Sequence, residues 1–392
     1  MKRWPIKQLG EFVEEQTERL REQSTTIYSV TNERGFVPSL DLFDKQVFSA
    51  DTGNYKCVGF HDLAYNPSRI NVGSVAMLED KNGGAVSPMY VILRCNSDLL
   101  PRYLLHFLKS DTGLHQIKQR CEGAVRFQLK FRDLCAIPIL APPLAEQERI
   151  VKLLDEADAL RKLRAQADRR TAQLIPVLFH EMFGDPVSNS RNWKRLSFYE
   201  LLDNIDGGWS PTCHDEPAQP DGWGVLKLGA VTTCNYIQTE NKALPANFSP
   251  RPELEVKTGD LLFTRKNTYE LVAACAFVSG TRPKLMLSDL IFRFKLKDNV
   301  EIDPLYLWGL LTVPSKRKQV QSFANGSAGS MPNISKAQLR KVPIEVPPLS
   351  LQKEFAKRVT EIREMEAAQS ASRRRMEDLF QAMLHRAFNG EL

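Results

Sequence analysis

One segment of the sequence groups residue types that could contact a nucleic acid. Residues 265–269 read Arg-Lys-Asn-Thr-Tyr and directly follow an apolar run at 261–264 that is typical of a β-strand. The two cations could pair with phosphates, while the amide and the phenol could reach base edges. A solvated surface turn could have the same composition, so both interpretations stay open. The candidate contacts in this segment are Arg265, Lys266, Asn267 and Tyr269.

Further candidates occur in both halves of the chain. The glycine-rich segment 325–330 could bring backbone amides close to phosphates, and Ser327 is its candidate residue. The corresponding segment of the first half, 123–130, carries Arg126 and Lys130 as candidate phosphate partners. Either segment could equally be a flexible loop. Three more arginines lie beside expected strands and could contact a nucleic acid or form structural ion pairs: Arg69, Arg94 and Arg293.

Patterns that would indicate catalysis or a metal site are weak. Pro220-Asp221 followed by Glu255-Val-Lys257 formally matches a Mg²⁺-dependent nuclease pattern, but this pattern is short and degenerate. The sequence contains no Gly-x-x-x-x-Gly-Lys-Ser/Thr loop, which argues against an ATPase. Cys213, His214 and Cys234 lack the spacing of a structural zinc site. We therefore expect a chain without catalytic residues and without a bound metal.

The composition is that of a folded protein with two or three domains. The chain has 392 residues, 42% of them hydrophobic and 26% charged, and a net charge of +6, which permits a nucleic-acid partner without requiring one. The longest apolar run, residues 271–278, is far shorter than the roughly 20 residues of a membrane span. The seven cysteines are scattered and odd in number, which favours free thiols in a reducing cytoplasm.

The strongest signal in the sequence is an internal repeat. Residues 137–147 (IPILAPPLAEQ) match residues 342–352 (VPIEVPPLSLQ) at an offset of 205, which also aligns Phe183 with Phe388. Upstream, Pro-Arg-Tyr-Leu at 101–104 matches Pro-Leu-Tyr-Leu at 304–307 at an offset of 203. Two looser echoes pair 69–74 with 255–260 and 87–94 with 288–293. The chain therefore consists of a globular part and a long helix, each present twice.

Each Pro-Pro-Leu is followed by apolar residues at a spacing near 3.5, which predicts a helix of about 40 residues, or roughly 60 Å. Nothing within one copy could bury such a stripe, so we expect the two helices to pack as an antiparallel coiled coil. Arg164 and Gln369 make both seams polar near the middle, where they could fix the register or simply face solvent. Pro176 should kink or interrupt the last turns of the first helix.

The expected fold class is α+β, with two mixed α/β domains in a pseudo-two-fold arrangement separated by the two long helices. The boundaries that we assign are 1–141 for the first domain, 142–185 for the first helix, 186–346 for the second domain and 347–392 for the second helix. Under this symmetry the chain termini should lie close together. Such a molecule suits a ligand that is itself two-fold, and duplex DNA with two half-sites is the obvious one.

With this duplicated architecture, the sequence resembles the specificity subunit of type I restriction–modification systems. The resemblance rests on the two Pro-Pro-Leu segments with their helices, and on family-like segments such as Gly-Asp-Leu-Leu-Phe-Thr-Arg at 259–265. It covers essentially the whole chain and lies in the doubled architecture rather than in any single motif. The resemblance implies that each domain is a target-recognition domain that reads one half of a split double-stranded DNA site, and that the chain is not itself an enzyme.

The resemblance also implies partners. Two methyltransferase subunits would dock on the helices and methylate adenine at N6 with S-adenosylmethionine, so this chain would bind no cofactor itself. Where present, ATP-dependent restriction subunits would join them. One departure from the repeat is Leu351, which stands where the first copy has Glu146 and could make the two docking surfaces unequal. The docking positions that we select on the helices are Gln147, Leu160, Gln352 and Met365.

A different class of function fits the same spacing. A protein scaffold could hold two binding modules apart on a coiled coil without binding DNA. Affinity for DNA that falls steeply as salt rises would indicate a DNA reader, whereas a scaffold should not respond to DNA. The sequence does not predict the bases of either half-site, because their readout depends on loop geometry.

Overall fold

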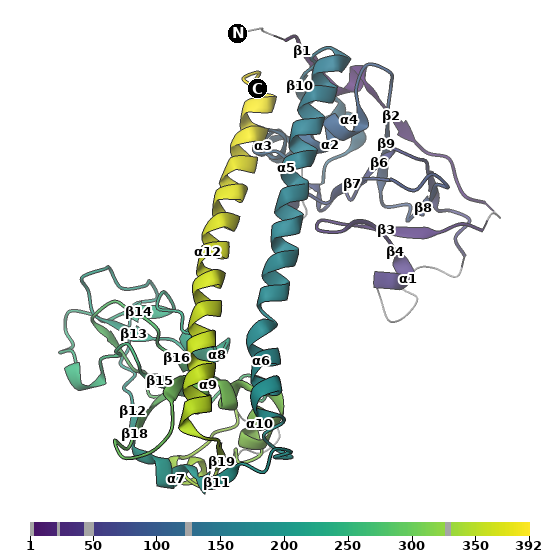
Figure 1. The fold of residues 1–392 in the computed structure, drawn as a ribbon. Helices are drawn as coiled ribbons and strands as arrows, with labels where there is room; N and C mark the ends of the chain where they lie inside the picture. The colour runs from purple at the N-terminus through teal and green to yellow at the C-terminus, as the bar shows by residue number, and fades with distance from the viewer. Residues whose placement is uncertain (1–3, 22–23, 43–50, 122–127, 326–330) are drawn as a thin grey trace. The chain divides into compact units, whose positions relative to one another are not determined.

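The chain folds into two compact units, seen here in a computed structural model that describes residues 4–21, 24–42, 51–121, 128–325 and 331–392 (Figure 1). Unit 1 comprises Met1–Ala167 and Gln369–Leu392, and unit 2 comprises Asp168–Ala368. The division cuts through the long helices rather than following the four consecutive segments expected from the sequence. Each unit therefore contains one globular domain and a part of each long helix.

Unit 1 contains two four-stranded sheets and a two-stranded one. The first sheet is antiparallel throughout and has the order β2-β9-β6-β7, formed by Val13–Gln16, Val91–Cys95, Leu63–Tyr65 and Val75–Met77. The second has the order β4-β3-β8-β5, formed by Gly35–Pro38, Ile27–Thr31, Gly84–Val86 and Lys56–Val58, with β3 and β8 parallel. The pair β1 and β10 joins Ile6–Gln8 to Pro138–Leu140. Short helices complete the domain: η1 (Leu9–Glu11), α1 (Ser39–Leu42), η2 (Ile70–Val72), α2 (Pro101–Lys109), α3 (Asp111–Arg120) and α4 (Phe131–Cys135).

Unit 2 repeats this topology. Its first sheet has the order β12-β18-β15-β16, formed by Leu202–Gly207, Ile291–Leu296, Leu261–Thr264 and Cys275–Phe277. Its second has the order β14-β13-β17, formed by Asn241–Ala243, Gly224–Leu226 and Leu285–Met286, with β13 and β17 parallel. The pair β11 and β19 joins Lys194–Ser197 to Pro343–Val346. Its short helices are α7 (Phe198–Leu201), α8 (Gly229–Thr232), η3 (Pro252–Leu254), α9 (Pro304–Thr312), α10 (Pro314–Gln321) and α11 (Lys336–Leu339).

The repeat seen in the sequence extends to individual contacts. Tyr103 in α2 and Tyr306 in α9 are both fully buried, and their hydroxyls donate to the carbonyls of Leu140 in β10 and Glu345 in β19. A phenylalanine at the end of a long helix packs on each tyrosine ring, with centroids 5.2 Å and 4.8 Å apart. The α+β fold and its internal duplication are confirmed.

One of the two looser sequence matches pairs segments that are not structurally equivalent. The sequence pairs residues 69–74 with 255–260, but the sheet orders make β15 the counterpart of β6 rather than of β7. The segment before β15, residues 257–260, therefore corresponds to residues 59–62. The recurrence of Val-Gly-Ser and Thr-Gly-Asp before two different strands misled the comparison, because glycine turns precede many short strands.

The long helices are α5 (Leu144–Thr171), α6 (Leu174–Phe183) and α12 (Leu349–Phe388). The interruption between α5 and α6 lies just before Pro176, as the proline predicted. In unit 1, Arg149 donates to the carbonyl of Leu392 and Arg161 to the carboxylate of Glu377, so the parts of α5 and α12 in this unit run antiparallel.

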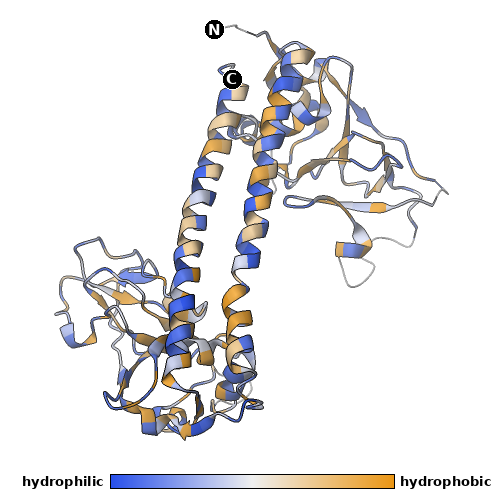
Figure 2. Ribbon diagram, viewed as in Figure 1, coloured by the Kyte–Doolittle hydropathy of each residue, from blue (hydrophilic) through white to orange (hydrophobic). Residues whose placement is uncertain are grey.

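The cores explain why the helix ends belong to different units. Ile150 and Leu154 of α5 share a buried cluster with Leu384 and Phe388 of α12 and with the domain of unit 1. In unit 2, helix α6 is largely hydrophobic (Figure 2). It packs against the start of α12, where the rings of Phe179 and Phe355 meet edge to face at 5.5 Å. The described chain ends lie close together in unit 1, as the symmetry predicted. Among the described helices, none is both long and apolar enough to cross a membrane.

Candidate nucleic-acid interface and helix surfaces

Two buried glutamines fix the start of each long helix to its domain. The side-chain amide of Gln147 donates to the carbonyls of Asp98 and Pro142, both at 2.9 Å, and its oxygen accepts from the backbone amide of Leu100 at 2.8 Å. The second copy reproduces this arrangement: Gln352 donates to Glu301 and Pro347 and accepts from Asp303 at 2.8 Å. Both side chains are fully buried. Our selection of these two residues as a docking surface is therefore corrected, because a partner subunit cannot reach them.

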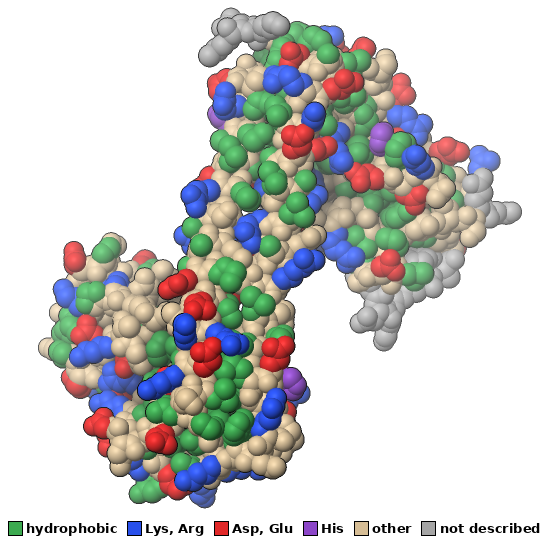
Figure 3. Space-filling model, viewed as in Figure 1, with side chains coloured by type: hydrophobic (Ala, Val, Ile, Leu, Met, Phe, Trp, Pro, Cys, Tyr) green, Lys and Arg blue, Asp and Glu red, His purple; other side chains and the backbone are tan. Residues whose placement is uncertain are grey.

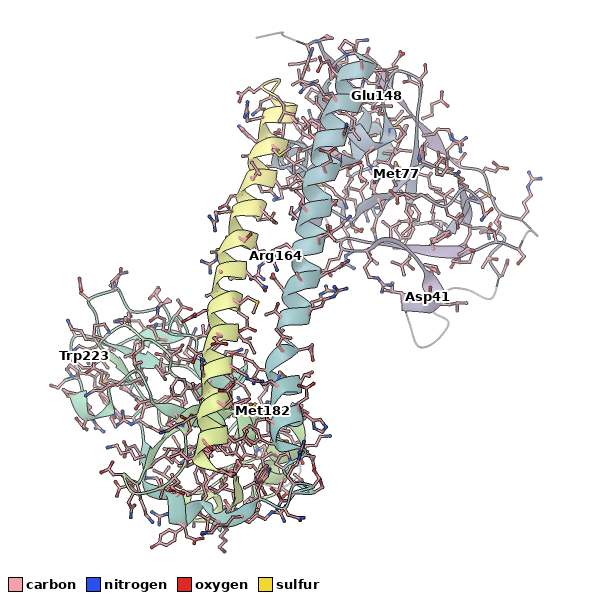
Figure 4. The ribbon with its side chains drawn as sticks, in the orientation of Figure 1. Asp41, Met77, Glu148, Arg164, Met182 and Trp223 are labelled. Carbon is pink, nitrogen blue, oxygen red and sulfur yellow. The ribbon has the colours of Figure 1, made fainter. Side chains whose placement is uncertain are left out.

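The other two selected helix positions are exposed. Leu160 on α5 is 55% exposed and Met365 on α12 is 44% exposed, and the two are equivalent at the offset of 205. Leu174 and Leu379 form a second equivalent pair of exposed apolar side chains. Large apolar side chains that remain exposed at repeated positions are typical of protein contact surfaces. Docking of a partner there stays a prediction, as does the register role of Arg164 and Gln369 (Figure 4 labels Arg164 on α5).

The helix surfaces of the two units differ in polarity. In unit 1, Arg161 pairs with Glu377 at 2.6 Å and with Asp158 at 3.3 Å, and its guanidinium lies 4.2 Å from the centroid of the Phe380 ring. At the offset of 205, Arg161 corresponds to Glu366 and Phe380 to Ile175. In unit 2 these residues line a mostly apolar cavity of about 390 Å³, together with Pro176, Phe179 and Trp308. Burial raises the pKa of Glu366, and the nearby Arg363 only partly offsets this. This inequality agrees with the one suggested by Leu351.

The candidate segment of the second domain directly follows β15, an inner strand of its sheet. Tyr269 is 59% exposed, whereas Asn267 is buried and accepts from the backbone amide of Thr268 at 2.8 Å. The half-buried guanidinium of Arg265 lies 5.3 Å from the Phe292 ring, and Lys266 pairs with Asn333 in an isolated β-bridge. Tyr269 is therefore the side chain of this segment that is best placed for an external contact, and Asn267 acts within the turn.

Arg293 forms structural ion pairs, which was one of the two roles that the sequence left open for it. It is 6% exposed and donates to Asp206 at 2.7 Å and 3.0 Å, to Asp260 at 3.3 Å, and to the carbonyls of Glu253 and Glu255. Burial opposes the charge of Asp206, but the hydrogen bonds and charge of Arg293 outweigh it and lower the pKa of Asp206. With its donors engaged inside unit 2, Arg293 holds β12, β15 and β18 together and is not available to DNA.

Arg94 combines a structural bond with an exposed guanidinium. Its Nε and Nη2 atoms donate to the two carboxylate oxygens of Asp62, each at 2.8 Å, and Asp62 is buried. The side chain of Arg94 nevertheless remains about half exposed, at 53%. A bidentate pair of this kind orients both partners. Arg94 therefore fixes the turn that carries Asp62, whatever it contacts outside.

The remaining candidates are exposed or undescribed. Arg69 is exposed at the start of η2, and Lys130 is exposed at the start of α4. Arg126 and Ser327 lie outside the described residues. The basic run 316–318 offers no further contact at Lys316, whose side chain is fully buried and pairs with Glu345 at 2.7 Å. On the face drawn in Figure 3, cationic and anionic side chains are interspersed in each unit rather than gathered into one basic field.

The catalytic and metal alternatives gain no support. The carboxylate of Glu255, from the nuclease-like pattern, accepts from the backbone amide of Lys284 at 2.6 Å, and the amide of Lys257 donates to Asp260. Both residues thus serve the local backbone. In the described part of the chain, no group of three or more His, Cys, Asp and Glu side chains is arranged to hold a metal ion.

Two aromatic groups, one exposed and one partly buried, were missed in the sequence. Phe60 and His61 stack on a turn of the first domain, with centroids 3.7 Å apart. In the second domain, Arg251 lies 4.1 Å from the centroid of the Trp209 ring, which also meets Phe248 edge to face. The only sequence signal was an aromatic residue beside a cation or histidine, and that signal is too common to select a site.

Comparisons with known proteins agree with the duplicated fold. The family model described as type I restriction modification DNA specificity domain matches residues 1–169 and 235–370. The specificity subunit of the type I restriction enzyme EcoEI from Escherichia coli is 40% identical over 161 residues, which cover 41% of this chain and 27% of that protein. The EcoKI specificity subunit from Escherichia coli strain K12 is 26% identical over 77% of this chain and 68% of that protein.

Solved structures show the same fold. A structure concerned with complex assembly and conformational transition of the type I R-M system contains a chain with a TM-score of 0.62 and 18% identity, over 100% of this chain and 99% of that one. The S subunit of a type I restriction–modification system from M. genitalium has a TM-score of 0.57 and 12% identity, over 98% of this chain and 96% of that one.

Proposed function

Because this chain belongs to the type I restriction–modification DNA specificity family, we propose that it reads a bipartite double-stranded DNA site, with one recognition domain for each half-site. It would carry no catalytic group of its own. Its partners would be two methyltransferase subunits, which use S-adenosylmethionine to methylate adenine at N6, and, where present, ATP-dependent restriction subunits. The site of action would be the cytoplasm, where a bacterial host keeps its DNA.

The observation that carries this proposal is the duplication of the whole structural plan. Two domains of the same strand order each have a helix fixed to them by an equivalent buried glutamine. A protein built as two similar but unequal readers suits a DNA site with two different half-sites. A scaffold with two binding modules would not need the family's recognition-domain sequence, which matches most of the chain.

The helices have two tasks in this proposal. Their length sets the spacing between the half-sites, and their exposed apolar residues, such as Leu160 and Met365, receive the methyltransferase subunits. Those subunits must flip the target adenine out of the duplex to reach its amino group. The specificity chain therefore contributes position, and the partner contributes chemistry.

The test is methylome sequencing of a host that lacks adenine methylation and carries this chain with its neighbouring methyltransferase gene. We expect a split motif methylated on both strands that disappears when this chain is omitted. Exchange of residues 1–136 for those of another family member should alter one half of the motif only. If a soluble complex forms but no site is methylated and the complex shows no salt-dependent affinity for DNA, the scaffold alternative holds instead.

A further inference from the structure

A tight turn in the first domain presents an exposed aromatic pair. In residues 59–62, the backbone amide of Asp62 donates to the carbonyl of Gly59, and the carboxylate of Asp62 accepts from the amide of Gly59 at 2.8 Å. The amide of His61 donates to the carbonyl of Leu78 at 2.8 Å, which fixes the turn to the residue that directly follows β7. Phe60 is 44% exposed and stacks on the imidazole of His61 at an interplanar angle of 25°.

The second domain contains the same turn without the aromatic pair. In residues 257–260, the amide of Asp260 donates to the carbonyl of Lys257, the carboxylate of Asp260 accepts from the amide of Lys257 at 2.8 Å, and the amide of Gly259 donates to Val278 at 2.8 Å. Each hydrogen bond has its counterpart in residues 59–62. The two turns therefore share one hydrogen-bond pattern. They differ at their first three residues, which are Gly-Phe-His at 59–61 and Lys-Thr-Gly at 257–259.

The replacement of glycine by histidine is unfavourable for the backbone. The third residue of both turns is left-handed, with φ of +95° at Gly259 and +67° at His61. Glycine adopts this conformation freely, whereas a residue with a side chain is disfavoured there because its Cβ approaches the following carbonyl oxygen. Strained residues of this kind persist where the surrounding structure holds them, and they concentrate at functional sites. The first domain thus retains a strained residue at a position where its own second copy shows that glycine fits.

The rest of the turn is arranged to hold the pair in place. Arg94 binds both carboxylate oxygens of Asp62, and Asp62 in turn binds the first residue of the turn. The guanidinium stays half exposed beside a hollow of about 340 Å³ whose lining includes Phe60, Arg94, Gln16, Lys81 and Asn82. One acidic residue, Glu18, also lines this hollow. Two cations and two amides around an exposed ring are the residue types that contact duplex DNA, and a carboxylate among them can accept from cytosine N4.

We propose that the turn 59–62 reads bases of the half-site assigned to the first domain. The exposed edge of Phe60 contacts the base edges, with the thymine methyl group as its natural apolar target. His61 supports the ring by stacking, while Asp62 and Arg94 are positioning residues. This inference rests on the proposed function, because it names residues that would give the first domain its specificity.

The test gives the second and third residues of the turn the identities that they have in the second copy. The double variant Phe60→Thr/His61→Gly keeps the backbone geometry and removes the strain, so we expect it to fold at least as stably as the unmodified chain. In the methylome assay, we expect about a tenfold loss of discrimination at one or more bases of one half-site. The other half-site serves as an internal control and should stay unchanged. The variant Leu40→Thr, which removes an exposed apolar side chain from α1 of the same domain, is the matched control and should retain the full motif.

The possible outcomes are separable. If the unmodified chain directs no methylation, the proposed function fails before this inference is tested. If the unmodified chain directs a split motif and the double variant directs the same motif with equal stringency, the inference is wrong. The double variant could direct no methylation although its complex assembles. In that case we measure its equilibrium affinity for the wild-type duplex and for duplexes altered in each half-site. Unchanged affinity and discrimination there would also overturn the inference, and weakened selectivity confined to the first half-site would support it.

A second variant tests the positioning role. Arg94→Lys keeps the charge but cannot bind both oxygens of Asp62, so the turn should lose its fixed orientation. We expect discrimination in the same half-site to fall while the salt dependence of DNA binding changes little, since the charge is retained. A uniform loss of affinity for all duplexes would instead indicate that Arg94 acts as a phosphate contact.

Discussion

At the residue scale, one cross-strand position shows how the two copies have diverged inside a common plan. In unit 2, β11 and β19 place Arg195 opposite Glu345, and the fully buried Lys316 also reaches this carboxylate. In unit 1, the equivalent strands place Ile6 opposite Leu140. Burial lowers the pKa of Lys316, and the pairing with Glu345 only partly offsets this. An ionic group has therefore replaced an apolar contact without a change of strand register.

Removal of one member of this buried pair should be costly. Lys316→Met leaves Glu345 buried with only Arg195 as its ionic partner, and breaking a buried pair typically costs about 3–5 kcal/mol. We expect a large fall in the denaturant midpoint of the variant. Addition of Glu345→Leu, the residue of the first copy, should recover most of the loss because no buried charge then remains uncompensated. A double variant as unstable as the single one would contradict this account.

The pair of Arg293 and Asp206 makes unit 2 sensitive to acid. Arg293 lowers the pKa of Asp206 in the folded state. The ionised Asp206 side chain therefore stabilises the fold fully above the unfolded-state pKa of about 4, and this stabilisation is lost as the pH falls through the lowered folded-state pKa. Asp206→Asn should therefore be less stable than the unmodified chain at pH 7, and the difference should shrink towards pH 3. Denaturant midpoints at both pH values test this. Asp203→Asn, at an exposed position of the same strand, is the control, and an equal pH dependence in that variant would contradict the assignment.

At the element scale, the start of each long helix depends on one side chain. Gln147→Ala would leave the carbonyls of Asp98 and Pro142 and the amide of Leu100 without their partner, at a cost of about 1–3 kcal/mol for each buried group that finds no substitute. We expect a clear fall in thermal stability and an equivalent fall for Gln352→Ala. Gln166→Ala, at an exposed position of α5, should change stability little. Equal effects at Gln147 and Gln166 would show that the buried amide is not needed.

The elements also show what the sequence could predict. The Pro-Pro-Leu segments, the Tyr103 and Tyr306 matches and the break near Pro176 were readable because each depends on local chain chemistry. The roles of Gln147 and Arg293 were not readable, since a polar side chain is buried or exposed according to segments far away in the sequence. Phe60 and His61 were missed for the same reason. The role that we infer for Phe60 and His61 comes from a comparison with residues 257–260. The sequence match had paired those residues with the wrong segment.

At the scale of the whole molecule, the chain interleaves its parts. Each compact unit takes the beginning of one long helix and the end of the other, so neither domain is separable with its own helix alone. Leu384 and Phe388, at the C-terminal end of α12, complete the core of unit 1. A fragment that ends before these residues would expose Ile150 and Tyr103, and a domain placed between the same helices must supply the apolar residues that pack on them.

The proposed spacing role of the helices gives the last prediction. Insertion of about seven residues, or two helical turns, after Ala167 in α5 and after Ala368 in α12, where the two units meet along the chain, preserves the period of the apolar stripe and the cores at the helix ends. Because the inserted turns lengthen only the connection between the two units, we expect the methylated motif to keep both half-sites and to acquire a longer spacer. The same insertion in one helix only should abolish methylation, since the paired stripes then fall out of register. Methylome sequencing distinguishes the double insertion from the single one. An unchanged spacer in the doubly lengthened chain would contradict the idea that the helices set the distance between the half-sites.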